Sequence, residues 1–320
     1  MPTLPNQASE RVHKVRKTFL IVATFALVAA GFTPAAQANT QKTLVIIDSG
    51  IAAELPFAKE MIVDEACFIE YGRCPNGQST MFGKGAASLP VARINHKAMH
   101  HGTQMASVAY QIDPSTKLVM IRIVGMSEKG FANSYTTRAV TRALTWVNLN
   151  AERLNVGAVS LSIGRGYKEA SCPIEPELQS QVQQLAARNI PVVAATGNGS
   201  NKFKVDYPAC VPEVLAIGAT DRRYTVKAIQ GWVYPIMLMS NSGPDLDFYT
   251  LGRFPTTDVY GQQAISIGTS SATVAFAANM VRLRNTGLDY PTVLSGIKTS
   301  LVNAYRTVTD FARLHYQIGG

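Results

Sequence analysis

Residues 43–48 read TLVIID, a short apolar and β-branched run that ends in a carboxylate and is followed by Ser49-Gly50. Continuous apolar runs of this length, bounded by Gly, Pro or Asn, are typical of strands buried on both faces of a sheet. Other runs of the same kind are KLVMIRIV (117–124), VGAVSLSI (156–163), IPVVAAT (190–196) and VLAIGAT (214–220). The sequence therefore predicts a set of buried strands.

Segments with helical spacing of apolar residues separate these runs: GTQMASVAYQ (102–111), SYTTRAVTRALTWVNLNAERLN (134–155) and PELQSQVQQLAARN (176–189). Strands that alternate with helices predict an α/β fold, with a doubly wound, mostly parallel sheet covered by helices on both faces. Functional groups in such folds collect beyond the carboxyl ends of the strands. We expect one domain over residues 39–320, with its site at that edge of the sheet.

The first 38 residues have the pattern of a secretion signal. Basic residues up to Lys17 precede the apolar stretch FLIVATFALVAAGF (19–32), and TPAAQA (33–38) places small residues ahead of a mature start at Asn39. An uncleaved membrane anchor is the alternative, but the apolar stretch is shorter than the roughly 20 residues that span a bilayer. We expect export to the periplasm or the medium, with no stable membrane span after cleavage.

The formal net charge of +9 raises the question of a nucleic-acid partner. The first 17 residues supply +3 of that charge, because four basic residues there face only Glu10. The remaining basic residues are scattered, with no run of five or more. This distribution argues against a nucleic-acid groove and indicates a generally basic surface.

The four cysteines, Cys67, Cys74, Cys172 and Cys210, all follow the predicted cleavage site. An even number of cysteines in an exported chain predicts disulfides. Of the three pairings that are open, we favour Cys67–Cys74, which closes a Pro/Asn/Gly loop, and Cys172–Cys210, which joins two distant segments. Zinc is the competing use of four cysteines, but no C-x2–4-C pair is present, and no metal site is expected.

Four polar residues stand where a strand ends or a helix begins. Asp48 ends TLVIID, His101 heads HGTQMAS (101–107), Asn198 follows a predicted strand in ATGNGS (195–200), and Ser270 lies in IGTSSATVAFAANM (267–280). Each has an ordinary structural interpretation as a turn former or a helix cap. Together they supply what a nucleophilic serine needs: a base, a carboxylate to orient the base, and a donor for the developing oxyanion.

The order Asp48, His101, Ser270 along the chain is the order in subtilisin and differs from that in chymotrypsin and the α/β-hydrolases. No G-x-S-x-G motif occurs. With VIIDSG (45–50), HGTQMAS and GTSSAT (268–273), the chain from 43 to about 305 resembles the subtilisin-like serine peptidases, or subtilases. SLSIG (160–164) resembles the strand that lines their substrate groove, and VVAATGN (192–198) the segment that carries the oxyanion asparagine.

The resemblance implies a role for each residue of the four. Ser270 would be the nucleophile, His101 the general acid–base, and Asp48 the group that orients the imidazole. Asn198 would stabilise the oxyanion together with the backbone N–H of Ser270. Ser271 and His100 are neighbours without a catalytic role. The expected protein is a secreted serine endopeptidase that cleaves peptide bonds through an acyl-enzyme.

The resemblance also implies that substrate binds as an added β-strand. The two walls of the primary pocket would comprise Ser162, Ile163 and Gly164 on one side and Ala194, Ala195, Thr196 and Gly197 on the other. Asp206 would lie near the base of this pocket and favour Lys or Arg before the scissile bond. Alternatively, Asp206 is a surface residue in a lysine-rich loop. Arg165 stands at the pocket entrance, where the family often has glycine.

Two departures from the family pattern concern folding and metals. The loop YQIDPSTK (110–117) lacks the length that carries calcium in many relatives, so a tight calcium site is not expected there. No cofactor is expected to be required, and structural calcium elsewhere is left open. Nine residues separate the predicted cleavage site from Asp48, so no propeptide is evident.

We expect a monomer that acts on polypeptides and folds unaided or with a chaperone or inhibitor protein. A catalytically silent, subtilase-like peptide-binding protein is the alternative function.

Overall fold

The computed structural model describes residues 41–169, 171–221, 223, 226–228, 231–233, 235–305 and 317–318. Residues 1–40, with the predicted secretion signal and the predicted mature start at Asn39, lie outside the described residues. Chain contacts group Asn39–Gly320 into one compact unit. The description below concerns that unit.

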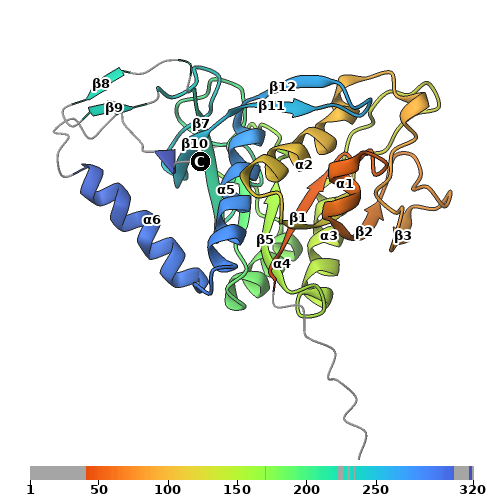
Figure 1. The fold of residues 1–320 in the computed structure, drawn as a ribbon, viewed down its shortest axis with the longest axis horizontal. Helices are drawn as coiled ribbons and strands as arrows, with labels where there is room; N and C mark the ends of the chain where they lie inside the picture. The colour runs from red at the N-terminus through yellow and green to blue at the C-terminus, as the bar shows by residue number, and fades with distance from the viewer. Residues whose placement is uncertain are drawn as a thin grey trace, which may run out of the picture. The chain divides into compact units, whose positions relative to one another are not determined.

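A large sheet runs through this unit (Figure 1). Its strands are β1 Thr43–Asp48, β2 Ile62–Phe68, β3 Thr80–Phe82, β4 Lys117–Arg122, β5 Val156–Leu161, β6 Val192–Ala195, β7 Val214–Thr220, β10 Phe248–Leu251 and β13 Gln317–Ile318. Two separate antiparallel pairs are β8 Val226–Ala228 with β9 Gly231–Val233, and β11 Arg253–Thr257 with β12 Gln263–Ile267. The α-helices are α1 Pro56–Met61, α2 His101–Ile112, α3 Thr137–Asn150, α4 Pro176–Ala187, α5 Thr269–Arg284 and α6 Tyr290–Tyr305, and short 3-10 turns occupy Val91–Arg93 and Lys97–His100.

The strand order is β13-β10-β7-β6-β5-β1-β4-β2-β3, and every pairing is parallel except that of β2 with β3. After β1 the chain forms β2, β3 and β4 on one side of β1, and it then crosses to the other side of β1 to form β5. Parallel strands place their carboxyl ends at one edge, so Asp48 at the end of β1 lies beside the residues that follow β4 and β5. This edge, at the change of direction in strand order, is where doubly wound folds place their sites.

Alternation along β1 separates the two cores of the unit. Leu44 and Ile46 pack with residues of α2 and α5, whereas Val45 and Ile47 pack with residues of α3 and α4. All four side chains are fully buried. A strand covered on both faces must be apolar at every position, which explains the unbroken run in TLVIID. Figure 1 shows α2 and α5 together on one side of the sheet, with α3 and α4 behind it.

The predicted fold class is confirmed, and the element bounds differ mainly at the strand ends. The runs expected at 117–124, 156–163 and 190–196 pair only as 117–122, 156–161 and 192–195. Ile123 and Thr196 each donate one further backbone bond to the neighbouring strand, and the chain beyond these strand ends then forms the loops at the site. The helix expected at 134–155 spans 137–150, because Thr136 caps it by accepting a hydrogen bond from the N–H of Ala139.

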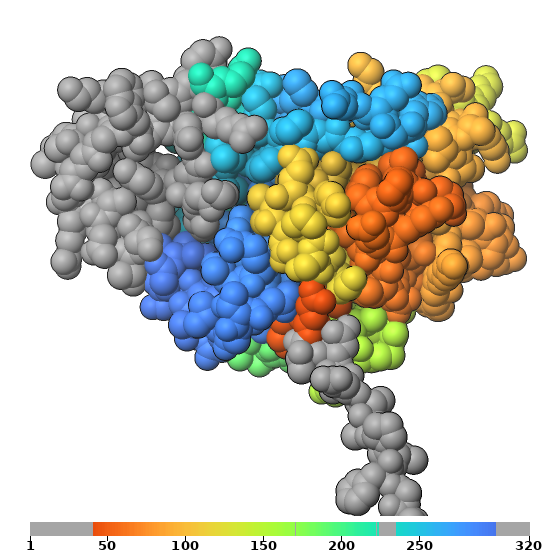
Figure 2. Space-filling view, viewed as in Figure 1, coloured from red at the N-terminus to blue at the C-terminus, as the bar shows by residue number. Residues whose placement is uncertain are grey.

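The β11–β12 hairpin (light blue in Figure 2) lies across the end of α2 and leads into α5. The backbone N–H of Thr257 donates to Ser107 Oγ (3.0 Å), and Gln111 donates to the carbonyl of Pro255. The hairpin thereby ties α2 to the strand that precedes α5. These two helices carry residues of the predicted site.

Both favoured disulfides form: Cys67–Cys74 closes a separation of seven residues and Cys172–Cys210 a separation of 38.

Within the part of the chain that the structure describes, no helix has the length and apolar character needed to cross a bilayer.

The two disulfides differ in the length of chain that they close, which sets how far each restricts the unfolded state. Chain entropy predicts a loss of about 4 kcal/mol for Cys172→Ala/Cys210→Ala and about 2 kcal/mol for Cys67→Ala/Cys74→Ala. Urea unfolding of both double variants and of the parent measures the difference. An equal or smaller loss for the Cys172 pair would contradict this entropic account.

Candidate active site

Asp48 ends β1 with its side chain almost fully buried, at 1% exposure. Its Oδ1 accepts the backbone N–H of Ser49 (2.6 Å), and its two carboxylate oxygens lie 2.8 and 2.9 Å from Nδ1 of His101. A carboxylate can only accept hydrogen bonds, so this contact places the imidazole proton on Nδ1. The other ring nitrogen, Nε2, is then unprotonated in the neutral imidazole and can act as a base.

The end of β1 is joined directly to the start of α2. Ser49 Oγ accepts the N–H of Gly102 (3.0 Å), and Thr103 Oγ1 accepts the N–H of Ala52 (3.0 Å). A Cβ at Gly102 would lie 2.2 Å from the carbonyl oxygen of Gly50, so only glycine permits this approach of the two segments. The residues on either side of the Asp48–His101 contact are therefore positioned by backbone packing as well as by side chains.

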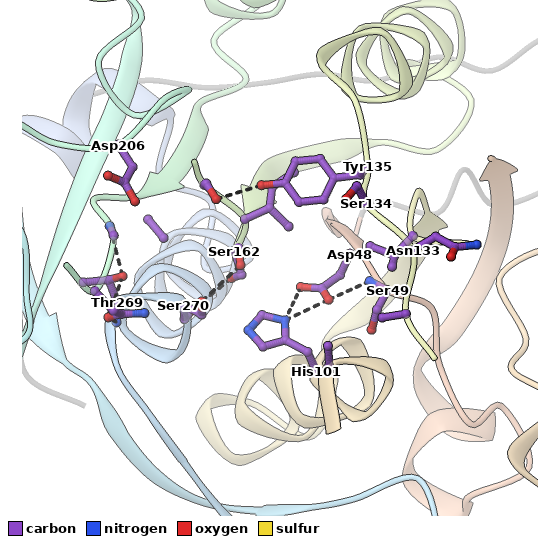
Figure 3. A pocket seen from close by; sticks show the side chains of 18 residues that line it. Asp48, Ser49, His101, Asn133, Ser134, Tyr135, Ser162, Asp206, Thr269 and Ser270 are labelled. Atoms are coloured by element: carbon purple, nitrogen blue, oxygen red, sulfur yellow. Dashed lines mark hydrogen bonds and ion pairs between the residues drawn. The ribbon is translucent and has the colours of Figure 1, made fainter. Parts of the chain in front are cut away.

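The environment of His101 acts on its pKa in both directions. Burial lowers the pKa, whereas the charge of Asp48 and the hydrogen bond to it raise the pKa, and the net result is a raised value. The side chain is 31% exposed, so one side of the ring still faces the cavity. Figure 3 shows the imidazole between Asp48 and Ser270.

Ser270 lies in the first turn of α5, where backbone N–H groups have no acceptor within the helix. The side chain of Ser270 is half-buried and lines the cavity. The adjacent Ser271 is fully buried, and its Oγ donates to Ser266 Oγ (2.7 Å). The helix start thus separates the two serines: one faces the cavity and the other lies in the core.

Ser270 Oγ donates to the carbonyl oxygen of Ser162 (3.0 Å), and Ser162 Oγ donates in return to the carbonyl of Ser270 (2.9 Å) (Figure 3). Among the hydrogen bonds of the described residues, none joins Ser270 to His101. The expected nucleophile and the expected base therefore share one cavity without contacting each other in this state. Such contacts are often loose in unliganded enzymes and tighten when substrate binds.

Asn198 has its side-chain amide orientation determined by Thr269. Asn198 Oδ1 accepts both the backbone N–H (3.0 Å) and the hydroxyl (3.1 Å) of Thr269. The same hydroxyl accepts the N–H of Gly197 (3.2 Å). With Oδ1 held in this way, the Nδ2 group is the remaining polar end of the amide, and Asn198 lines the cavity near Ser270.

A cavity of about 500 Å³ contains these side chains. Most of the residues expected to contact substrate line it, namely Ser162, Ile163, Gly164, Ala195, Gly197 and Asp206. Ala194 and Thr196 do not line it; both are fully buried, and Thr196 Oγ1 donates to the carbonyl of Asn241 (3.1 Å). Alternation along β6 and its extension points these two side chains into the core, so the expected substrate contact is not seen for them.

Asp206 is half-buried at the far side of the cavity from His101 (Figure 3). Burial raises the pKa of its carboxyl group, and a hydrogen bond from Asn241 Nδ2 to Oδ1 (3.0 Å) and the positive charge of Lys204 partly offset that effect. The alternative interpretation places Asp206 in a surface loop beside Lys202 and Lys204. The ammonium groups of both lysines donate hydrogen bonds to backbone carbonyls. Asp206 is therefore not a fully exposed residue paired with those lysines.

Arg165 does not line the cavity. Its guanidinium group lies over the ring of Tyr207, 5.5 Å from the centroid, and donates to Thr137 Oγ1 (3.1 Å).

Tyr135 is a cavity residue that the sequence did not indicate, because no motif marks it. Its hydroxyl donates to the carbonyl of Gly164 (2.9 Å), and burial raises its pKa to about 12, so it stays a neutral donor that joins the two sides of the groove.

No group of three or more His, Cys, Asp or Glu side chains able to hold a metal ion occurs in the described ranges. The chemistry of the cavity is that of an imidazole on a buried carboxylate, beside a hydroxyl and an amide.

Comparisons with known proteins bear on the family of this chain. A model of the subtilase family matches residues 40–315. Subtilisin Savinase of Lederbergia lenta is 27% identical over 213 residues, which are 63% of this chain and 70% of that protein. An alkaline protease of Shouchella clausii is also 27% identical over 63% of this chain, but the match covers 49% of that protein.

Solved structures show the same fold. A psychrophilic protease superposes with a TM-score of 0.63 at 16% identity, covering 82% of this chain and 84% of the other. Sphericase superposes with a TM-score of 0.60 at 16% identity, covering 80% and 82%. At such identities the superpositions bear on the fold alone. The match of the family model to most of the chain shows that it belongs to the subtilase family and is a serine-type endopeptidase.

Proposed function

We propose that this chain is an exported endopeptidase whose nucleophile is Ser270, whose general base is His101 and whose orienting carboxylate is Asp48. The observation that carries the proposal is the pair of contacts from Asp48 to His101 Nδ1, at 2.8 and 2.9 Å, in the cavity that Ser270 lines. These residues come from β1, α2 and α5, which are far apart in the sequence. The predicted secretion signal supports export.

In the proposed reaction, His101 Nε2 takes the proton of Ser270 as Oγ attacks the carbonyl carbon of the scissile bond. Asp48 keeps the proton on Nδ1 and stabilises the imidazolium that forms. The imidazolium then protonates the leaving amine, and water hydrolyses the acyl-enzyme through the same base. Asn198 Nδ2 and the N–H of Ser270 donate to the oxyanion, and the N-terminus of α5 favours its negative charge.

The hydrogen bond from Ser270 Oγ to the Ser162 carbonyl is the resting state in this proposal. A substrate bound as an extended strand along Ser162–Gly164 would use that carbonyl as an acceptor for its own N–H. Ser270 Oγ would then lose its acceptor and turn to His101 Nε2. Substrate binding would thus complete the contact between nucleophile and base.

For the residue before the scissile bond, we propose a preference for Lys or Arg. Asp206 supports this because its carboxylate lines the cavity beside Gly164 and Gly197. A Cβ at Gly197 would lie 2.1 Å from Asp206 Oδ2, so glycine there keeps the carboxylate accessible. Burial raises its pKa, and a bound cation would relieve the cost of the buried charge.

One observation favours the alternative of a catalytically silent peptide-binding protein: Ser270 Oγ is bonded to Ser162 and not to His101. The two candidate functions differ in whether Ser270 is activated as a nucleophile.

A fluorophosphonate probe decides between the two functions because it reacts only with an activated serine. We expect labelling of the mature protein and of Ser271→Ala, since Ser271 is bonded to Ser266 in the core. We expect none on Ser270→Ala. Absence of label on every folded form, with folding checked by circular dichroism, would favour the binding protein.

The pH dependence of kcat/KM tests the role of Asp48. The base must be neutral, and its pKa is raised, so activity should fall on acidification through a pKa above the ordinary histidine value. Asp48→Asn removes the negative charge that raises this pKa and leaves the burial that lowers it. The acidic limb should move to lower pH and kcat/KM should fall by about 10⁴-fold. Asp245→Asn, an exposed residue outside the cavity, is the control. An unchanged acidic limb in Asp48→Asn would count against the triad.

Peptides that differ only before the scissile bond test Asp206. Wild type should cleave the Lys and Arg peptides in preference to Leu and Phe, and Asp206→Asn should reduce that preference by about 10-fold to 100-fold in kcat/KM. Because burial raises the pKa of Asp206, the preference should also fade on acidification earlier than for an exposed Asp. Comparable turnover of Lys, Leu and Phe peptides by wild type would refute this specificity.

A further inference from the structure

A second cavity, of about 750 Å³, adjoins the candidate active site. Asn133 lines both cavities, and its Nδ2 donates to the carbonyl of Tyr71 (2.8 Å) in the loop on the far side. In Figure 3 Asn133 and Asp206 lie at opposite ends of the active-site cavity. The second cavity therefore begins at the end remote from the Asp206 pocket.

Arg122, the last residue of β4, lines this second cavity and is only 2% exposed. Its Nε donates to the carbonyl of Val124 (3.0 Å), and one terminal nitrogen donates to the carbonyl of Ser88 (3.2 Å). Val124 also lines the active-site cavity. The Arg122 side chain passes over Gly50, where a Cβ would lie 2.9 Å from Arg122 Cδ.

This buried cation forms no ion pair with any carboxylate among the residues that the structure describes. Burial lowers the pKa of Arg122 to about 10. The guanidinium group therefore stays charged at neutral pH, in surroundings where an unpaired charge is costly. Backbone carbonyls satisfy two of its nitrogens, while a guanidinium group has five N–H donors.

The carboxylate on the neighbouring strand is engaged elsewhere. Glu65 of β2 is also buried, but its carboxylate accepts the N–H groups of Gly85 and Ala87 (3.2 Å for Ala87). It lines a different cavity, on the other side of Ser88. Glu65 is thus held by backbone donors and does not neutralise Arg122.

The second cavity carries further positive charge at its rim. Arg73 and Arg93, both exposed, line it together with the buried Arg122, whereas Glu128 is the acidic residue among its lining. Three cations against one carboxylate make the cavity a favourable place for an anion, and a planar carboxylate matches the guanidinium fork.

We propose that this cavity is a subsite that binds a carboxylate side chain of the peptide substrate, held by Arg122 with Arg73 and Arg93. The inference rests on the proposed function, because it takes the ligand to be the peptide in the adjoining groove. Together with Asp206 at the other end, the subsite would select peptides with a basic residue before the scissile bond and an acidic residue at a second position.

The test uses peptides with Lys before the scissile bond, in which each other position from P4 to P3′ is replaced in turn by Glu or by Gln. At low ionic strength we expect one position where Glu exceeds Gln in kcat/KM by about tenfold, the effect of one charge-assisted contact. That ratio should fall toward one in Arg73→Gln/Arg93→Gln and in Arg122→Gln. It should persist in Arg138→Gln, which removes an exposed arginine of α3 that lies outside the cavity. The double variant decides the outcome if Arg122→Gln does not fold.

Binding to the Ser270→Ala variant separates this inference from the proposed catalysis. Fluorescence anisotropy gives the Kd of the Glu and Gln peptides without any turnover. A tighter Glu peptide whose advantage is lost in the arginine variants supports the subsite, even if no peptide is cleaved. Equal affinity at every position, or a Glu preference that survives the arginine substitutions, would overturn it.

Discussion

The contact between Asp48 and His101 depends on one constraint, the close approach of the end of β1 to the start of α2. Two hydrogen bonds cross this junction: Ser49 Oγ accepts the N–H of Gly102, and Thr103 Oγ1 accepts the N–H of Ala52. The Gly50 carbonyl occupies the space where any side chain at position 102 would lie. Because backbone and short side chains set this approach, His101 Nδ1 lies within hydrogen-bond distance of both carboxylate oxygens of Asp48. The geometry of the proposed base follows from packing in the two cores on either side of β1.

The start of α5 completes the site by a similar device. Gly268 lies at φ +128°, and a Cβ there would lie 2.7 Å from Asn198 Oδ1, so the start of α5 and the Asn198 amide approach more closely than a side chain at position 268 would allow. Thr269 joins Gly197 and Asn198 to the helix through its hydroxyl. The segments that follow β6 and β12 are thus joined to each other at the point where charge would develop in the proposed reaction.

Charge at the two ends of the cavity has opposite sign. Asp206 lies at one end as a half-buried carboxylate, and Arg122 lies beyond the other end as a buried cation that no carboxylate of the described residues pairs with. Each charge is costly where it stands, and each would gain from a ligand of opposite sign.

By itself the sequence determined the fold class, the family motifs and the order of Asp48, His101 and Ser270, because buried strands and helix starts carry local patterns of apolar and small residues. It also indicated the two disulfides by their spacing. Tertiary structure alone decided which side chains share a cavity. Ala194 and Thr196 lie in the core. The hydroxyl of Ser270 donates to the carbonyl of Ser162, and the hydroxyl of Tyr135 donates to the carbonyl of Gly164. Arg122 appears in the sequence as one residue of an ordinary strand, and only the packing of distant loops around it leaves its charge unpaired. Contacts between segments far apart in the chain have no local pattern, so no reading of one segment could have predicted them.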